Sequence, residues 1–373
     1  MGYIAVKGGT LAIEESIKRL KYKRLKHGEI LSINAIQAGM RGLIDQIISE
    51  SSLYSEELAA IAIKQAEGNS EEAVFLLRAF RSTLPRKHYT RIAESSHMRI
   101  ERRISASFKD IPGGQILGAT YDYTHRLIDF ELIDESEVEA LSWLKKFKND
   151  AAQVKSKEDL RNLPKVIDYL REEGLIKTFE NDDKCPIDTT KKSIEFPTQR
   201  SERLQILTRG QTGAVISLGY AALRGYGSLH PTVGELRVGN LPLYISNPLE
   251  DNCAKEDDYY FGEIVVTEVE MFIPQAVQEK KGKQKLEFGI GYGICYGQNE
   301  TKAMAMGILD QCLETKDEKY PTQNEEFVLL HIDSVESSGF MSHLKLPHYV
   351  TFQSKLDSIR KTKKGEDVVE NKL

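Results

Sequence analysis

Apolar residues recur at helical spacing through the N-terminal part of the chain. The clearest run, 33–48, places isoleucine, leucine and methionine side chains three to four positions apart and follows Ser32, a favourable N-cap residue. The same spacing predicts three more helices, at 11–26, at about 56–67 after Ser55, and from Asn69 to just before Pro85. Together they indicate a helical domain over residues 1–95.

The hydrophobic period falls to two after this domain. From Met98 to Phe108 apolar and polar residues alternate, which is typical of a half-buried strand with Arg103 on its polar side. A turn rich in proline and glycine, 110–114, precedes a second run, 119–130, that we expect to be extended. Residues 96–133 are therefore predicted to form a pair of strands.

The pattern is weakest over residues 134–199. Charged helices at 136–149 and 158–173, followed by a polar loop, predict a divergent helical insertion or spacer there. The elements expected further on are a helix at 212–223, strands at 234–245, 259–273 and 286–296, a helix after Asn299, a buried strand at 327–332 and a last helix at 351–361. The basic residues 362–373 are expected to be a disordered tail.

These elements predict an α+β fold. A helical N-terminal domain is followed by a mixed, largely antiparallel sheet region with packed helices, and residues 200–361 form a C-terminal α+β domain. The last of the three strands carries glycine at 289, 291 and 293, so one of its faces lacks side chains and can take a helix, another backbone or a ligand. Together with Met304 and Met306 on the next helix, this strand predicts a surface for close contact with partners.

Composition sets limits on the class of protein. The 373-residue chain is long enough for two or three domains, and its net charge of −5 argues against nucleic-acid binding. It contains no long apolar run and no signal peptide, so we expect no membrane span and a cytoplasmic location. Cys185, Cys253, Cys295 and Cys312 are scattered, which predicts free thiols and no iron–sulfur cluster in this chain.

Residues able to do chemistry gather in two segments. The run 119–130 holds Asp122, His125 and Asp129, which are candidate acids and bases, and Arg126, which with Lys109 is a candidate for binding phosphate. A second segment, 224–230, holds Arg224 and His230 around glycines that let backbone amides approach an anion. This segment lacks the lysine and hydroxyl residue of a P-loop. A solvent-facing or subunit-facing strand is the alternative interpretation of 119–130.

Two histidines, His343 and His348, stand five residues apart near the C-terminus. Neither a helix nor a strand brings side chains at this spacing to one point, whereas a turn at Pro347 can fold both imidazoles onto one metal ion or anionic substrate. Two unrelated loop histidines are the alternative, because a closed zinc site needs further ligands.

The order of several motifs resembles one known family, PhnI, a core subunit of the bacterial carbon–phosphorus lyase system. The motifs that carry the resemblance are Ala5-Val-Lys-Gly-Gly, Phe75-Leu-Leu-Arg-Ala-Phe-Arg, Met98-Arg-Ile-Glu-Arg-Arg-Ile-Ser-Ala, Lys109-Asp-Ile-Pro-Gly-Gly-Gln, Thr120-Tyr-Asp-Tyr-Thr-His-Arg-Leu, Arg224-Gly-Tyr-Gly, Lys302-Ala-Met-Ala-Met and Ser342-His-Leu-Lys-Leu-Pro-His-Tyr. They cover roughly 3–133 and 200–356, whereas 134–199 matches no pattern of the family.

The resemblance implies partners and a reaction. PhnI-like proteins assemble with PhnG, PhnH and PhnJ, and the ATPase-like subunits PhnK and PhnL join the system. With PhnG, PhnH and PhnL, the family displaces adenine from ATP by an alkylphosphonate such as methylphosphonate, giving ribose 1-methylphosphonate 5-triphosphate. Alone, it is a purine nucleosidase that converts ATP or GTP to ribose 5-triphosphate and free base, and the ATP is expected to carry magnesium. By the same resemblance, His343 and His348 bind zinc at the interface with PhnJ.

The chemistry of this reaction requires three kinds of group. Displacement at the anomeric carbon passes through an oxocarbenium-like state, which a carboxylate stabilises, while an acid protonates the departing purine and cations hold the phosphorus anions. Residues 109–131 and 224–237 contain all three kinds of group. The sequence does not assign a role to each of them. A mainly structural subunit that lends the two histidines to PhnJ is the alternative, and a free-standing zinc hydrolase is a third, weaker interpretation.

Overall fold

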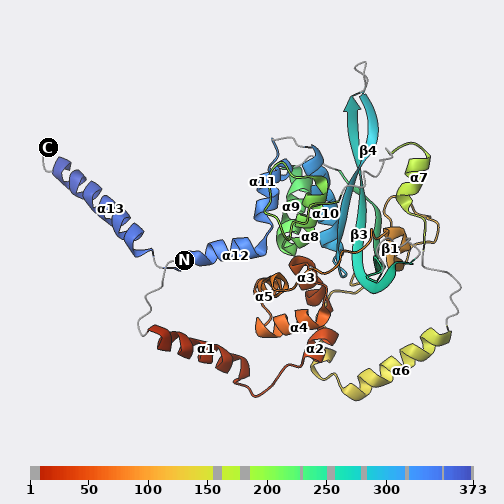
Figure 1. Cartoon of the computed structure of the whole chain (residues 1–373), viewed down its shortest axis with the longest axis horizontal. Coiled ribbons are helices and arrows are strands. Elements are labelled where there is room, and N and C mark those ends of the chain that lie inside the picture. Colours follow the sequence, from red (N-terminus) through yellow and green to blue (C-terminus); the bar gives the residue numbers. More distant parts are fainter. Residues whose placement is uncertain are drawn as a thin grey trace.

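The computed structural model describes residues 9–153, 162–176, 185–226, 230–249, 257–278, 284–315, 319–346 and 348–370. Within these ranges a four-stranded antiparallel sheet lies at the centre of the body and helices pack on it, so the predicted α+β class is confirmed. Figure 1 shows α1, α6 and α13 projecting away from this body. Residues 5–8 of the first motif named above, together with Gly227, Cys253 and Pro347, lie outside the described residues.

The N-terminal residues form five helices where four were expected. They are α1 (Gly9–Leu25), α2 (Ile33–Gly39), α3 (Arg41–Ser51), α4 (Glu56–Gln65) and α5 (Ser70–Ser82). The predicted N-caps are confirmed, because Ser32, Ser55 and Asn69 each accept a hydrogen bond from a backbone amide of the first turn. The single helix expected over 33–48 is wrong: Met40 leaves helical geometry at φ −120°, ψ 37°, between two weak helix formers, Gly39 and Gly42.

These helices enclose a hydrophobic core of their own. The buried side chains that form it include Ile36, Ile44, Ile47, Ile48, Ile63, Val74 and Leu77. By contrast, α1 buries no residue and presents Leu11, Ile17 and Leu20 to solvent. The core therefore comes from α2–α5, and α1 stands apart from it (Figure 1).

The sheet is a simple antiparallel meander. Its strands are β1 (Arg99–Ile104), β2 (Thr232–Ile245), β3 (Tyr259–Gln278) and β4 (Gln284–Tyr296), in that order. The three strands predicted in the C-terminal half are confirmed. β1 pairs with β2 although more than a hundred residues separate them along the chain, so the strand after the helical domain joins the edge of the later sheet.

The second strand expected over 119–130 is wrong. Residues 119–129 form an irregular exposed loop that ends in a short 3₁₀ helix, Phe130–Ile133. Gly118 and Arg126 have positive φ angles of 61° and 57°, which interrupt extended structure on both sides. The alternation expected in β1 also fails, because a bulge between Ile100 and Arg102 turns both Arg102 and Arg103 into the interior.

One face of the sheet is covered by α10 (Glu300–Thr315). The core here joins β2, β3 and β4 to α10 through buried side chains such as Val238, Val269, Met271, Cys295, Met306 and Leu309. Gly291 and Gly293 let the backbone of α10 lie directly on β4, because a Cβ on either would meet the carbonyl group of Gly307 or Ala303. The expectation that this glycine face contacts partners is therefore wrong: the chain's own helix covers it.

Replacing Gly293 by Ala should destabilise the fold by about 1–3 kcal/mol or more, since a backbone carbonyl of α10 cannot move aside as a side chain can. Gly289→Ala is the matched control, because its Cβ would meet only the flexible end of Gln275. Urea denaturation of both variants measures the difference. Equal midpoints would show that α10 does not rest on the glycine face.

The other elements surround this centre. They are α6 (Glu137–Gln153), α7 (Val166–Glu172), α8 (Arg200–Arg209), α9 (Thr212–Ala221) with a π-helical turn at Ala222–Tyr226, α11 (Glu325–His331), α12 (Ser334–His343) and α13 (Tyr349–Glu370). α7 packs with Ile111 on the face of the sheet opposite α10, against Phe272 and Ile290. α6 lies within the predicted insertion and buries no residue.

Two expectations for the C-terminal part are wrong. The apolar run 327–332 was expected to be a buried strand, but it belongs to helix α11 and its C-cap, Ile332. Asn324 caps this helix, and only Val328 and Leu329 of it are buried. So short an apolar run does not distinguish a strand from a helix by its pattern. α13 continues to Glu370, so the helix end expected at 361 is wrong. Most of the tail that was predicted to be disordered, 362–373, is therefore part of this helix. Residues 371–373 lie outside the described residues.

Candidate functional site

The histidine pair lies where two projecting helices meet. His343 is the last residue of α12 and His348 immediately precedes α13, so the predicted turn between them is a helix-to-helix connection. The two rings are 5.5 Å apart between centroids and inclined at 68°. Nδ1 of His343 contacts the carbonyl oxygen of Phe340, and Nδ1 of His348 lies 2.6 Å from that of Leu346. Because a carbonyl only accepts, both Nδ1 atoms carry the hydrogen, which in a neutral imidazole leaves the lone pair on Nε2.

This geometry fits a metal ligand pair. An Nδ1–H bonded to a backbone carbonyl is the usual support of a histidine that binds a metal through Nε2. In a tetrahedral zinc site with Zn–N bonds of about 2.0–2.1 Å, two ring centres would lie about 5 Å apart, close to the spacing found. Among the described residues no group of three or more His, Cys, Asp or Glu side chains completes such a site. Further ligands would have to come from substrate or another chain.

A polar pocket brings two of the predicted residues, Asp122 and Arg126, to the helical domain. Its volume is about 270 Å³, and it is lined by Arg41, Gly42, Asp45, Ala119, Thr120, Tyr121, Asp122, Arg126, Gln298, Glu300 and Thr301. We call it the Asp122 pocket. It joins α3, the loop after Gly118 and the start of α10, three segments that are far apart in the sequence.

The loop is held in place by the buried side chain of Arg102. Its guanidinium donates to Asp122 Oδ2 at 2.5 Å and to the carbonyl of Leu117, and it pairs with Glu300 at 2.9 Å. Arg126 lies 4.0 Å from the other oxygen of Asp122 and 5.8 Å from the centre of the Tyr121 ring. Asp122 thus lies between two arginines, Arg102 and Arg126.

A second carboxyl in the pocket has a different environment. Burial raises the pKa of Asp45, although the Gln298 amide and Arg41 act in the opposite direction. The Asp122 pocket therefore contains one carboxylate held by arginines, one carboxyl group with a raised pKa, and the guanidinium groups of Arg41 and Arg126. Such a set can stabilise positive charge, transfer a proton and bind an anion.

The other candidates lie elsewhere. His125 is exposed, and its Nδ1 accepts a hydrogen bond from the Leu127 amide at 3.2 Å. Asp129 caps the 3₁₀ helix that follows it. Arg224 lies over the ring of Tyr220 at 5.9 Å, while Lys109 and His230 are exposed.

The strand register separates the two predicted segments. Arg102, which holds Asp122, pairs with Val238, whereas His230 precedes the start of β2 at Thr232. Six residues of strand, about 20 Å, lie between Val238 and Thr232. His230 is thus well removed along β2 from the position whose partner strand holds Asp122.

The sequence did not reveal a buried cluster of charges on the face opposite α10. Arg237 pairs with Glu268, Arg103 pairs with Glu235, and Lys165 reaches both Glu268 and Glu270 at 3.0 and 2.9 Å. Carboxylates at alternate positions of an otherwise apolar strand, 268 and 270, were the available signal. Arg237 belonged to a segment considered for substrate binding, but it is buried and supports the sheet instead.

The two carboxyl groups of this cluster differ in their pKa. Burial raises the pKa of Glu268, but Arg237 and Lys165 outweigh it and lower the value to about 2. Burial also raises the pKa of Glu270, Lys165 compensates only in part, and the charge of Glu268 adds to the rise. Glu268 is therefore ionised in the folded protein, and Glu270 resists ionisation.

Taken together, these features define an α+β protein with a polar, arginine-rich pocket beside its sheet and a pair of neighbouring histidine rings on its C-terminal helices. The chain belongs to the PhnI family of bacterial phosphonate metabolism proteins, whose family model matches residues 2–366. None of the helices in the described ranges is both long and apolar enough to cross a bilayer.

Curated relatives match over nearly their whole lengths. The chain is 40% identical over 368 residues to the putative C-P lyase subunit protein HtxH of Stutzerimonas stutzeri, covering 97% of this chain and 96% of that protein. It is also 40% identical to two proteins named alpha-D-ribose 1-methylphosphonate 5-triphosphate synthase subunit PhnI. These are from Rhizobium meliloti strain 1021, with 99% and 96% covered, and Escherichia coli strain K12, with 98% and 99% covered.

Proposed function

We propose that this chain is the subunit that carries the ribosyl-transfer step of phosphonate catabolism. With PhnG, PhnH and PhnL homologues it displaces adenine from ATP by an alkylphosphonate such as methylphosphonate, giving alpha-D-ribose 1-methylphosphonate 5-triphosphate. Alone it acts as a purine nucleosidase on ATP or GTP. The observation that carries the proposal is the nearly full-length match to two PhnI proteins that are named as synthase subunits for this compound.

The Asp122 pocket supplies suitable groups for this step. Asp122, fixed by Arg102, faces the positive charge that develops on the ribose, and Arg41 and Arg126 bind phosphorus oxyanions. Asp45, with its raised pKa, is a proton donor to the departing base, and His125 and His230 remain candidates for the same task. Asp129 is a weaker candidate because it already caps a helix, and Lys109 and Arg224 remain candidates for phosphate binding.

Assembly with other subunits is the second part of the proposal. We expect contacts with PhnG, PhnH and PhnJ, with PhnK and PhnL joining them, in the cytoplasm. The support is the apolar surface of the projecting helices α1, α6, α12 and α13, which expose large side chains that include Leu11, Ile17, Trp143, Phe147, Phe340 and Phe352. Co-expression followed by size exclusion tests this point, and elution of a free 42.2 kDa chain would contradict it.

The proposed metal is zinc, held by Nε2 of His343 and Nε2 of His348 at the interface with PhnJ, where it would polarise a substrate oxygen. Magnesium is expected with the ATP substrate. A mainly structural role, in which the histidine pair serves a site on PhnJ while the chemistry occurs elsewhere, is the second candidate. It is favoured by the position of the pair on a projecting arm, where His348 is exposed and His343 partly exposed.

The purified chain is expected to release adenine from ATP, and the partner-supplemented chain with methylphosphonate is expected to form the phosphonate-linked ribose product. Chromatography of the base and phosphorus NMR measure the two outcomes. Asp122→Asn should lower base release by about a hundredfold or more, because it removes a charge from the transition state. Asp134→Asn, on an exposed carboxylate outside the pocket, is the control. A folded, partner-supplemented wild type that releases no base would favour the structural role.

A further inference from the structure

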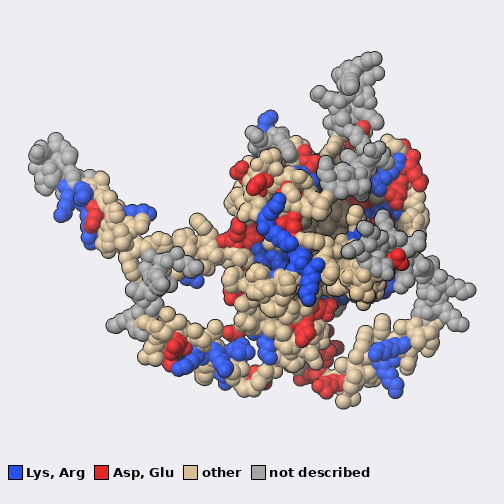
Figure 2. All heavy atoms as spheres, viewed as in Figure 1, with Lys and Arg blue, Asp and Glu red and all other residues tan. Residues whose placement is uncertain are grey.

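A second group of cations lies between α5, α8 and the loop before α8. Arg78 and Arg81 come from α5, Arg209 ends α8, and Arg86 follows α5. Figure 2 shows basic side chains gathered on the face of the molecule between the helical domain and the helices that cover the sheet. We call Arg78, Arg81, Arg86 and Arg209 the arginine cluster.

The cluster contains more positive than negative charge. Arg78 pairs with Asp333 at 2.6 Å and also donates to the carbonyls of Glu50 and Arg209. Arg86 lies 3.2 Å from Asp188. Neither Arg81 nor Arg209 forms an ion pair within the described residues, although Asp188 acts on both and Glu336 lines the cavity beside Arg209.

Both remaining guanidinium groups keep a buried donor without a hydrogen bond. Arg209 donates Nη1 to the carbonyl of Thr189 at 3.1 Å, but its Nε has no partner in the described part of the chain. Nη1 of Arg81 is likewise buried and unpartnered. The Oδ2 atom of Asp188 also lacks a hydrogen bond, yet a single oxygen beside Arg86 cannot satisfy two further guanidiniums. Unpaired buried donors are costly, so they point to a missing acceptor.

The charges of the cluster act on one another. Burial first, and then the neighbouring Arg78 and Arg81, lower the pKa of Arg209 to about 10, although Asp333 and Asp188 act in the opposite direction. Burial and the neighbouring Arg78 and Arg86 also lower the pKa of Arg81. An anion bound between them would relieve this repulsion.

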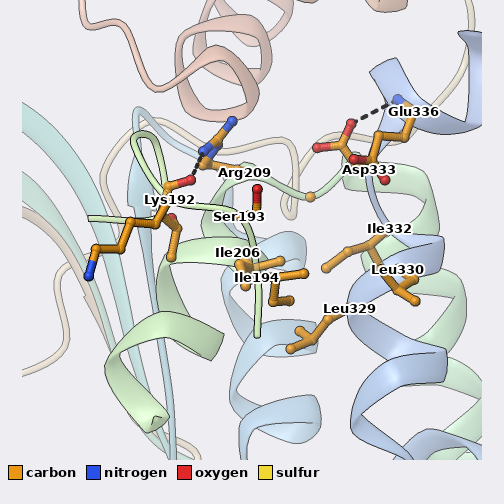
Figure 3. Close-up of a pocket in the computed structure, with 12 residues that line it drawn as sticks. Lys192, Ser193, Ile194, Ile206, Arg209, Leu329, Leu330, Ile332, Asp333 and Glu336 are labelled. Carbon is orange, nitrogen blue, oxygen red and sulfur yellow. Dashed lines mark hydrogen bonds between the residues drawn. The ribbon is translucent and has the colours of Figure 1, made fainter. Parts of the chain in front are cut away.

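A cavity of about 170 Å³ opens beside Arg209. Figure 3 shows Arg209 and Asp333 at one end of it and the side chains of Ile206, Leu329 and Ile332 at the other. This volume is below the range of about 300–1,000 Å³ typical of sites for drug-sized ligands, so the cavity suits a small group. The carboxyl groups of Asp333, which Arg78 already pairs, and of Glu336 also line the cavity. A compact oxyanion that carries a short apolar substituent matches the Arg209 guanidinium next to the aliphatic wall.

We propose that the arginine cluster is a binding site for a phosphorus oxyanion, with Arg81 Nη1 and Arg209 Nε as its unfilled donors and the adjoining cavity as the place for the substituent on phosphorus. The ligand chemistry is a phosphate or phosphonate group. The two candidate ligands, a free alkylphosphonate and the polyphosphate of a nucleotide, are taken from the function proposed above. The inference that an oxyanion binds here does not depend on that function.

The test is calorimetric binding of inorganic phosphate, methylphosphonate and tripolyphosphate to the full chain. Arg81→Met and Arg209→Met should each weaken binding by about ten- to a hundredfold, because each removes a charged hydrogen bond to the oxyanion. Arg91→Met is the matched control, since Arg91 is exposed and paired with Asp258 away from the cluster. If the two variants lose binding of methylphosphonate alone, the ligand is a free phosphonate. If they lose binding of tripolyphosphate alone, the ligand is the polyphosphate of a nucleotide.

Thermal unfolding without ligand separates binding from a structural role. Arg81→Met should keep or raise the melting temperature, because it removes a buried charge that has no carboxylate partner. Unchanged oxyanion binding in both variants, or equal weakening in Arg91→Met, would overturn the proposal. Release of base from ATP is measured separately and tests the proposed nucleosidase activity. The oxyanion site is therefore supported or overturned independently of that activity.

Discussion

An Arg237→Met variant is expected to be about 3–5 kcal/mol less stable than the wild type, the usual cost of removing one partner of a buried ion pair. Arg237 and Glu268 face each other on adjacent strands, β2 and β3, and both are almost completely buried. Without the guanidinium, Glu268 keeps Lys165 and the hydroxyl of Tyr292 as partners, but two carboxyl groups then share one ammonium. Urea denaturation at neutral pH measures the loss.

The appropriate control is an exposed pair. Arg360→Met breaks the contact with Asp357 on α13, where both side chains are exposed and solvent screens the charges, and should cost at most about 1 kcal/mol. A loss for Arg237→Met as small as that of the control would mean that the cluster of charges under α7 adds little to the stability of the sheet.

The same cluster predicts how stability depends on pH. Glu268 has a folded pKa of about 2 against an ordinary value of 4.5, so its stabilising contribution is complete above 4.5 and is lost as the pH falls towards 2. Glu270, whose pKa is raised, acts in the opposite direction: its contribution is present at low pH and is lost as the pH rises through its folded pKa. Removing Arg237 should therefore begin acid unfolding at a higher pH.

Local patterns predicted most of the elements correctly. Caps such as Ser55 and Asn69 act within one turn, and the three long strands alternate over many residues, so neither depends on the rest of the fold. The errors occurred where distant contacts decide the structure. The run 119–130 has the residues of a strand, but β1 takes β2 as its partner, and Arg102 holds the run as a loop.

The candidate sites show the same contrast between what local patterns predict and what distant contacts decide. Asp122 and Arg126 were found because they are close in the sequence, but the pocket they share with Asp45 joins segments that only the fold brings together. Arg81 and Arg209 carried no local signal, since each is an ordinary cation near the end of a helix. Their importance arises from burial and from the lack of a counter-charge, which the linear pattern does not contain.

Replacing either His343 or His348 by Ala is expected to abolish growth on methylphosphonate and to lower the zinc content of the purified complex. This prediction rests on the proposed zinc site. Each imidazole has its Nδ1 on a nearby backbone carbonyl, that of Phe340 in α12 or of Leu346, so a loss of Nε2 is expected to remove the proposed metal ligand and to change the fold little. Assembly and melting temperature should therefore stay unchanged in both variants.

His331→Ala provides the matched control. His331 is also exposed at the end of a helix and has Nδ1 2.6 Å from the carbonyl of Phe327, but its ring packs on that phenylalanine rather than on another imidazole. It should keep wild-type zinc and growth. Metal analysis of the three variants decides whether the histidine pair binds a metal or is only a contact between neighbouring rings. A double variant that retains zinc and supports growth would show that the pair is only a contact between neighbouring rings, whereas loss of both properties with intact assembly requires a ligand at the two Nε2 atoms.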